Sequence, residues 1–180
     1  MAQLQAGMKM PDFHFDTAEK QNIDFRNELQ KAPKTALVFL RYYGCTFCQM
    51  DMHDYEIHYE EITAGKGQFF VVLQSNPDHI RQQLAQHPLP YQIICDPEAK
   101  LYKQFEITAS ADMKDIVGPH TMLKAARAKK EGYTHGQYEG IETQLPATFI
   151  IAQDGTILSA YYAKHVDESA TAEYLKNALQ

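Results

Sequence analysis

The sequence lacks any apolar run long enough to cross a membrane. Its longest apolar segment, Thr35–Tyr43, has the length of one strand, whereas a spanning helix needs roughly 18 to 20 residues. The opening segment Met1–Met10 contains a single cation, Lys9, and no apolar stretch of the kind that a secretory signal needs. We therefore expect a cytoplasmic protein with no membrane role.

Positive charge is also scarce. The chain carries 17 Lys and Arg residues against 23 Asp and Glu residues, which leaves a formal net charge of -6. Because nucleic-acid binding relies on basic clusters that neutralise phosphates, we expect no nucleic-acid partner. The 180 residues are 44% hydrophobic, which is enough to fill one core, so we expect a single domain over residues 1–180.

Cysteine is infrequent, and its spacing matters more than its number. The three cysteines are too few, and odd in number, for the disulfide framework of a secreted protein. Cys45 and Cys48 are separated by two residues, and Cys95 lies far along the chain. The C-x-x-C spacing is therefore the feature most informative about function.

Short apolar runs alternate with segments of helical pattern through the first two thirds of the chain. Buried strands are expected at residues 35–43, 69–73 and 91–95. Helices are expected at residues 46–63, 77–86 and 98–105. This alternation predicts an α/β fold in which helices flank a central sheet.

Hairpin signals occur at both ends of the chain. Residues 147–151 and 156–162 are apolar runs joined by an Asp-Gly turn, and a helix is expected at 168–179. An antiparallel hairpin added to parallel strands makes the central sheet mixed. Residues 12–15 and 23–25 predict a further small hairpin as an amino-terminal extension.

Residues 110–143 form a less regular region between these parts. A helix is expected at 119–130, and it is followed by Gly132, Gly136 and Gly140. We interpret this region as a helical insertion before the carboxyl-terminal hairpin, with a loop that crosses another surface.

The dithiol stands where an apolar strand gives way to a helix. A thiol at the amino end of a helix lies near free backbone N–H groups, which favour the thiolate. A second thiol three residues on can displace a mixed disulfide that forms on the first. We assign Cys45 as the attacking cysteine and Cys48 as the resolving cysteine.

Two other interpretations of the cysteine pair stay open. Half of a zinc site would need further ligands, and a copper or zinc carrier would use Cys45, Cys48 and a histidine such as His53 or His135. The thiols can also be unreactive parts of a binding domain. Cys95 is interpreted as a small buried hydrophobe, with a regulatory or second resolving role as the alternative.

Tyrosine and proline near these features are candidate substrate contacts. Tyr42 and Tyr43 precede the dithiol; either ring can serve in packing, or its hydroxyl can bond a thiolate or substrate, and we select Tyr43. Pro146 directly precedes an apolar strand, where it cannot donate to the sheet and commonly marks a turn or a cis bond.

Four segments together resemble a known family. They are residues 7–13 (G-x-x-x-P-D-F), 41–48 (R-x-x-G-C-x-x-C), 95–102 (with D-P-x-x-x-L-Y) and 146–155 (P-x-T-F-x-I-x-x-x-G). The sequence resembles the thioredoxin-like superfamily, in particular its AhpC/TSA (redoxin) branch and the peroxiredoxin-like (PRXL2-type) proteins within it. The resemblance implies a thioredoxin-like fold over nearly the whole chain, no cofactor, and an insertion at Gly118–Gly140 that borders the site.

The resemblance also implies where a substrate docks. Pro146 would be a cis-proline facing the dithiol, and the backbone of Leu145 would be free to bond an extended substrate near Cys45. With Tyr43, these two residues are the predicted substrate-binding residues.

One departure from the family pattern bears on activity. Ordinary peroxiredoxins carry P-x-x-x-T-x-x-C, and here Arg41, Cys45 and Cys48 occupy the proline, threonine and cysteine positions. No arginine follows Lys130, where the family's peroxide-binding arginine would be expected. The tryptophan usual before a thioredoxin dithiol is absent as well.

We therefore expect a thiol-disulfide oxidoreductase that acts on protein or small-molecule disulfides and is reduced again by an external thiol. The alternative is a peroxiredoxin-like peroxidase in which Cys48 or Cys45 is oxidised by a hydroperoxide to a sulfenic acid.

Overall fold

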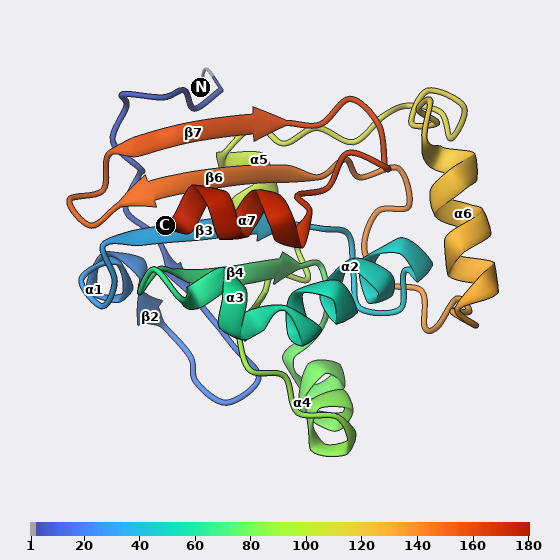
Figure 1. Cartoon of the computed structure of the whole chain (residues 1–180), viewed down its shortest axis with the longest axis horizontal. Helices are drawn as coiled ribbons and strands as arrows, with labels where there is room; N and C mark the ends of the chain where they lie inside the picture. The colour runs from blue at the N-terminus through green and yellow to red at the C-terminus, as the bar shows by residue number, and fades with distance from the viewer. Residues whose placement is uncertain (1–2) are drawn as a thin grey trace.

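The computed structural model describes residues 3–180, and within that range a five-stranded mixed sheet forms the centre of the molecule (Figure 1). The strands lie in the order β5-β4-β3-β6-β7. Their bounds are β3 (Lys34–Phe39), β4 (Gln68–Leu73), β5 (Gln92–Cys95), β6 (Ala147–Ala152) and β7 (Ile157–Tyr162). The fold confirms the predicted α/β class and its mixed sheet.

β3 is central because its residues are apolar and pack on both faces. It pairs parallel with β4 and antiparallel with β6, so that Leu37 stands beside Phe70 and Phe149. Alternate residues of a strand point to opposite faces. Leu37 therefore joins one core cluster and Val38 the other, and each fully buried side chain of this kind contributes roughly 1.5 to 3 kcal/mol.

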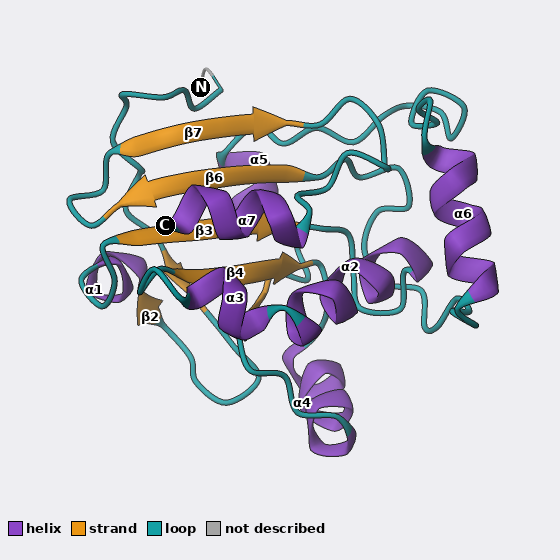
Figure 2. Cartoon of the chain, in the orientation of Figure 1, coloured by secondary structure: helices purple, strands orange, loops and turns teal. Residues whose placement is uncertain are grey.

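Helices cover both faces of the sheet (Figure 2). One face packs against α2 (Thr46–Ile57), α3 (Tyr59–Thr63), α4 (Pro77–Gln86) and α7 (Ala172–Leu179). The other face packs against α1 (Phe25–Leu29) and α5 (Lys100–Gln104). The remaining helix, α6 (Thr121–Lys130), belongs to the insertion and stands beside α2 at one end of the sheet (Figure 1).

The amino-terminal hairpin is present but shorter than predicted. β1 (His14–Phe15) pairs antiparallel with β2 (Ile23–Asp24). The prediction that Phe25 continues the strand is wrong, because Asp24 caps a helix there and its side chain accepts from the Arg26 N–H at 2.9 Å. The predicted helix 46–63 is likewise divided into α2 and α3, with His58 between them.

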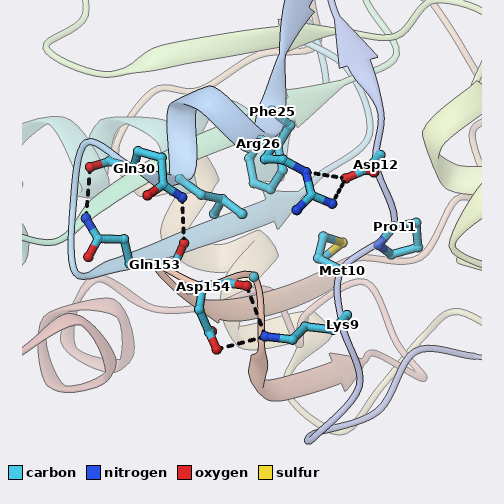
Figure 3. A pocket seen from close by; sticks show the side chains of 11 residues that line it. Lys9, Met10, Pro11, Asp12, Phe25, Arg26, Gln30, Gln153 and Asp154 are labelled. Atoms are coloured by element: carbon cyan, nitrogen blue, oxygen red, sulfur yellow. Dashed lines mark hydrogen bonds and ion pairs between the residues drawn. The ribbon is translucent and has the colours of Figure 1, made fainter.

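A hollow of about 170 Å³ lies where β3 begins, between the amino-terminal segment, α1 and the β6–β7 turn (Figure 3). Its polar side chains bond one another: Lys9 pairs with Asp154 at 2.8 Å, and Arg26 pairs with Asp12. Gln30 bonds the backbone of residue 153. These contacts join three segments, so we assign the hollow a structural role. No helix among residues 3–180 is both long enough and apolar enough to cross a membrane.

Candidate active site

The dithiol lies at the end of the sheet opposite to that hollow, in the turn between β3 and α2. Cys45 is the N-cap residue of α2, and its Sγ accepts from the Cys48 N–H at 3.3 Å. The Cys48 thiol donates to the same sulfur, with 2.7 Å between the two Sγ atoms. Both cysteines are free thiols. The structure thus brings together the two cysteines that the sequence selected.

Arg41 is a candidate functional residue that sequence reasoning missed. Its Nη2 donates to Cys45 Sγ at 3.1 Å, and its backbone N–H lies 3.4 Å from Cys48 Sγ. The family pattern drew attention to Arg41 only as the residue that replaces a proline. A cation at the end of an otherwise apolar strand, four residues before an N-cap cysteine, was the signal that could have identified it.

These contacts make the two thiols unequal. Burial alone would raise the pKa of Cys45, but the hydrogen bond from Cys48 and the charge of Arg41 lower the pKa to about 6. Burial and the neighbouring Cys45 raise the pKa of Cys48 well above its ordinary value. Cys45 is therefore the thiol of the pair that ionises more readily, and the thiolate is the nucleophilic form.

The insertion covers this turn, as the resemblance implied that it would border the site. The Gly136 N–H donates to the Gly44 carbonyl at 2.8 Å, and Gln49 Nε2 bridges that carbonyl and the Thr134 carbonyl at 3.0 and 2.9 Å. A side chain on Gly44 would collide with the backbone of residue 137. The close approach leaves Cys45 0% and Cys48 4% exposed.

Tyr42 contributes a second set of contacts between the strand end and the insertion. Its hydroxyl donates to the Glu142 carboxylate and lies 2.8 Å from His135 Nε2. His135 in turn stacks on Tyr138, with 3.8 Å between ring centroids. Burial, together with the hydrogen bond to Glu142, raises the pKa of Tyr42.

Tyr43 points away from this cluster. Its N–H donates to Ser75 Oγ at 2.9 Å, and its ring meets the His79 ring edge-on at 5.8 Å. Tyr43 borders a separate hollow of about 170 Å³ between α2 and residues His87, Leu89 and Tyr133. A role for Tyr43 in substrate binding stays a prediction.

The expectation of a cis-proline is wrong. The Leu145–Pro146 peptide bond is trans, like the other peptide bonds among residues 3–180. Nor is the Leu145 backbone free, because its N–H donates to the Thr108 carbonyl at 3.4 Å and its carbonyl accepts from Gln144 Nε2 at 3.3 Å. Thr108 and Gln144, which lie on either side of the insertion, thus bond the backbone that the resemblance left to a substrate. Substrate binding by Leu145 and Pro146 stays a prediction.

The histidines named for a metal carrier have other neighbours. His53 lies 3.2 Å from Glu56, and His135 bonds Tyr42. Over residues 3–180, no three His, Cys, Asp or Glu side chains are grouped so that they could hold a metal ion.

Cys95 is buried at the end of β5, where its N–H donates to the Asp16 carbonyl at 2.8 Å. Burial, with the charge of Asp16 adding to it, raises the pKa of Cys95 to about 12. This environment fits the interpretation of Cys95 as a small buried hydrophobe.

The fold is similar to solved structures of redox proteins. One is the peroxidoxin BcpB from Mycobacterium tuberculosis, with a TM-score of 0.69, 12% identity, and coverage of 98% of this chain and 96% of that chain. Another is named as thiol:disulfide interchange protein DsbE, from Chlorobium tepidum, with a TM-score of 0.61, 16% identity and coverage of 98% and 99%. A third is StoA from Bacillus subtilis, with a TM-score of 0.56, 17% identity, and coverage of 94% of this chain and 97% of that chain.

These likenesses confirm the thioredoxin-like fold. No curated protein sequence matches the chain significantly. The sequence profile of the AhpC/TSA family, however, matches residues 6–160, which include the dithiol turn and the carboxyl-terminal hairpin. The chain therefore belongs to the AhpC/TSA family.

Proposed function

We propose that this protein is a thiol-disulfide oxidoreductase that uses Cys45 as nucleophile and Cys48 as resolving thiol. The observation that carries the proposal is the unequal pair: Arg41 Nη2 and the Cys48 thiol both donate to Cys45 Sγ, at 3.1 and 2.7 Å. Donors of this kind stabilise a thiolate, and disulfide exchange begins with a thiolate.

The reaction then has two displacements. The Cys45 thiolate attacks one sulfur of the substrate disulfide, a mixed disulfide forms, and the other substrate sulfur leaves as a thiolate. Cys48, after losing its proton, attacks Cys45 Sγ, and the second substrate sulfur leaves. The substrate is reduced by two electrons, the protein holds a Cys45–Cys48 disulfide, and an external thiol must reduce it again.

The arrangement of charges supports this order of attack. The Cys45 thiolate is one of the groups that raise the pKa of Cys48, whereas Arg41 acts to lower it. Once Cys45 is bound in a mixed disulfide its negative charge is gone, and Arg41 then faces Cys48 alone. Formation of the mixed disulfide therefore promotes ionisation of the resolving thiol.

A peroxidase is the second candidate, and the cover over the dithiol favours it. Cys45 is 0% exposed, so a small hydroperoxide reaches its sulfur with less movement of the cover than a protein disulfide needs. Attack of the thiolate on the peroxide would release an alcohol or water and leave a Cys45 sulfenic acid. Condensation with the Cys48 thiol would then release water and form the same internal disulfide.

Oxidation rates of the reduced protein decide between the two activities. We would measure the rate with a small disulfide and, separately, with hydrogen peroxide, in the wild type and in Cys45→Ser, Cys48→Ser and Cys95→Ser. The proposal predicts fast disulfide exchange that is lost in Cys45→Ser and kept in the control Cys95→Ser, with peroxide oxidation no faster than that of a free thiol. Fast peroxide oxidation with slow disulfide exchange would establish the peroxidase instead.

A further inference from the structure

The hydroxyl of Tyr42 joins the strand end that carries the dithiol to the insertion that covers it. Tyr42 is 0% exposed as a residue, yet its oxygen bonds two side chains of the insertion. It donates to the Glu142 carboxylate, and His135 Nε2 lies 2.8 Å away. One oxygen atom thus holds two separate points of the covering segment.

Counting donors shows how these side chains share protons. His135 Nδ1 lies 2.8 Å from the Gly136 carbonyl, which only accepts, so Nδ1 carries a proton. Tyr42 has one proton, which goes to the Glu142 carboxylate, so the Tyr42 oxygen is the acceptor in its contact with His135 Nε2.

Glu142 also orients Arg41. Its backbone carbonyl accepts from Arg41 Nη1 at 2.7 Å, while Nη2 of the same guanidinium donates to Cys45 Sγ at 3.1 Å. Arg41 and Tyr42 are consecutive residues, so two neighbouring side chains bind Glu142 through different atoms. A displacement of Glu142 would therefore move the acceptor that aims the guanidinium at the sulfur.

We propose that Tyr42 is a positioning residue, which fixes Glu142, and through it the Arg41 guanidinium, against Cys45. The charged and titratable groups around Tyr42 are Arg41 and the two cysteines of the dithiol from the body of the protein, and His135, Tyr138 and Glu142 from the insertion. The inference rests on the proposed function for the use of the thiolate. It concerns the reduced protein before any substrate binds.

Tyr42→Phe tests the inference because it removes the hydroxyl and keeps the ring. In the reduced protein, ionisation of Cys45 would be followed against pH by thiolate absorbance and, independently, by the rate of alkylation with iodoacetamide. We expect the midpoint to rise by about one pH unit, which leaves roughly tenfold less thiolate at acidic pH. The matched control is Tyr161→Phe on β7, which removes a hydroxyl that donates to Glu168 at 3.1 Å, and it should leave the midpoint unchanged.

A structural role alone would lower the stability of Tyr42→Phe without moving the ionisation midpoint of Cys45, and that outcome overturns the proposal. An equal rise of the Cys45 midpoint in the control Tyr161→Phe also overturns the proposal. Because neither disulfide nor peroxide is added, a wild type without oxidoreductase activity would refute the proposed function and leave this result intact.

Discussion

The Arg41 guanidinium lies 3.1 Å from Cys45 Sγ, and after the hydrogen bond from Cys48 its charge is the strongest influence that lowers the pKa of Cys45. An opposite charge at this distance typically moves a pKa by 1 to 3 units. We therefore expect Arg41→Gln to raise the pKa of Cys45 by roughly 1 to 2 units. Alkylation rate against pH would measure the shift.

The control for this change is Arg26→Gln. Arg26 pairs with Asp12 beside the hollow at the other end of the sheet, so its loss removes the same charge from the protein without touching the dithiol. If Cys45 ionised with the same midpoint in Arg41→Gln as in the wild type, the assigned role of Arg41 would be contradicted.

The lowered pKa of Cys45 also predicts how the stability of the reduced protein varies with pH. A group whose pKa is lower in the folded state than in the unfolded state stabilises the fold above its unfolded pKa, and this contribution is lost as pH falls through the folded pKa. For Cys45 the window extends from the ordinary value of about 9 down to about 6. Urea unfolding at several pH values should show that, as pH falls through this window, the free energy of unfolding of the wild type decreases relative to that of Cys45→Ser. If the free energies of unfolding of the two proteins changed in parallel with pH, the result would be inconsistent with a lowered pKa of Cys45.

At the scale of elements, α6 is attached to α2 by a buried ion pair. Lys124 Nζ lies 2.8 Å from the Asp51 carboxylate, with the side chains 13% and 12% exposed, and Ser169 also donates to that carboxylate at 2.6 Å. Burial raises the pKa of Asp51. Removing Lys124 leaves this carboxylate without its cation, so we expect Lys124→Met to lower the free energy of unfolding by about 3 to 5 kcal/mol.

The double variant Asp51→Asn/Lys124→Met should recover part of that loss, because no buried charge is left unpaired. Lys176→Met is the control, since it breaks only an exposed pair with Glu61 and should leave the free energy of unfolding nearly unchanged. Denaturant unfolding would measure all three variants. A double variant no more stable than Lys124→Met would argue against the ion pair as the attachment.

A further prediction concerns Gly44, which lies against the covering segment. A methyl group there would collide with the backbone of residue 137, so Gly44→Ala should lift the cover and expose Cys45. We expect faster alkylation of Cys45 at alkaline pH, well above its lowered pKa, where access and not ionisation limits the rate. Gly132→Ala, at a φ of +81° in open space, is the control for strain alone. No change of rate in Gly44→Ala would show that access does not depend on this contact.

The elements show what sequence reasoning can and cannot supply. Apolar runs and the Asp-Gly turn predicted the five strands of the central sheet, because burial on two faces requires such runs. Phe25 was misplaced because the capping carboxylate of Asp24 starts a helix there, a local hydrogen bond that an alternating pattern does not reveal. The pair of cysteines was predicted from spacing and position alone.

For the whole molecule, the limit of sequence reasoning was contact between distant segments. Arg41 contacts Cys45 directly, but its guanidinium also donates to the carbonyl of Glu142, which is about a hundred positions away in the chain, and no local pattern encodes that second contact. The expectation of a free Leu145 backbone failed for a similar reason, since its N–H donates to the carbonyl of Thr108 in a distant segment. The insertion thus changes the site more than the family pattern indicates.

The central claim about the whole molecule is that one sulfur, that of Cys45, attacks a disulfide. The most direct test mixes Cys48→Ser with a small symmetric disulfide and locates the trapped adduct by mass spectrometry of peptides. The account predicts a stable mixed disulfide on Cys45 that accumulates faster than any adduct on Cys48 in Cys45→Ser or on Cys95 in either variant. Faster capture at Cys48 or Cys95 would contradict the assignment of the nucleophile.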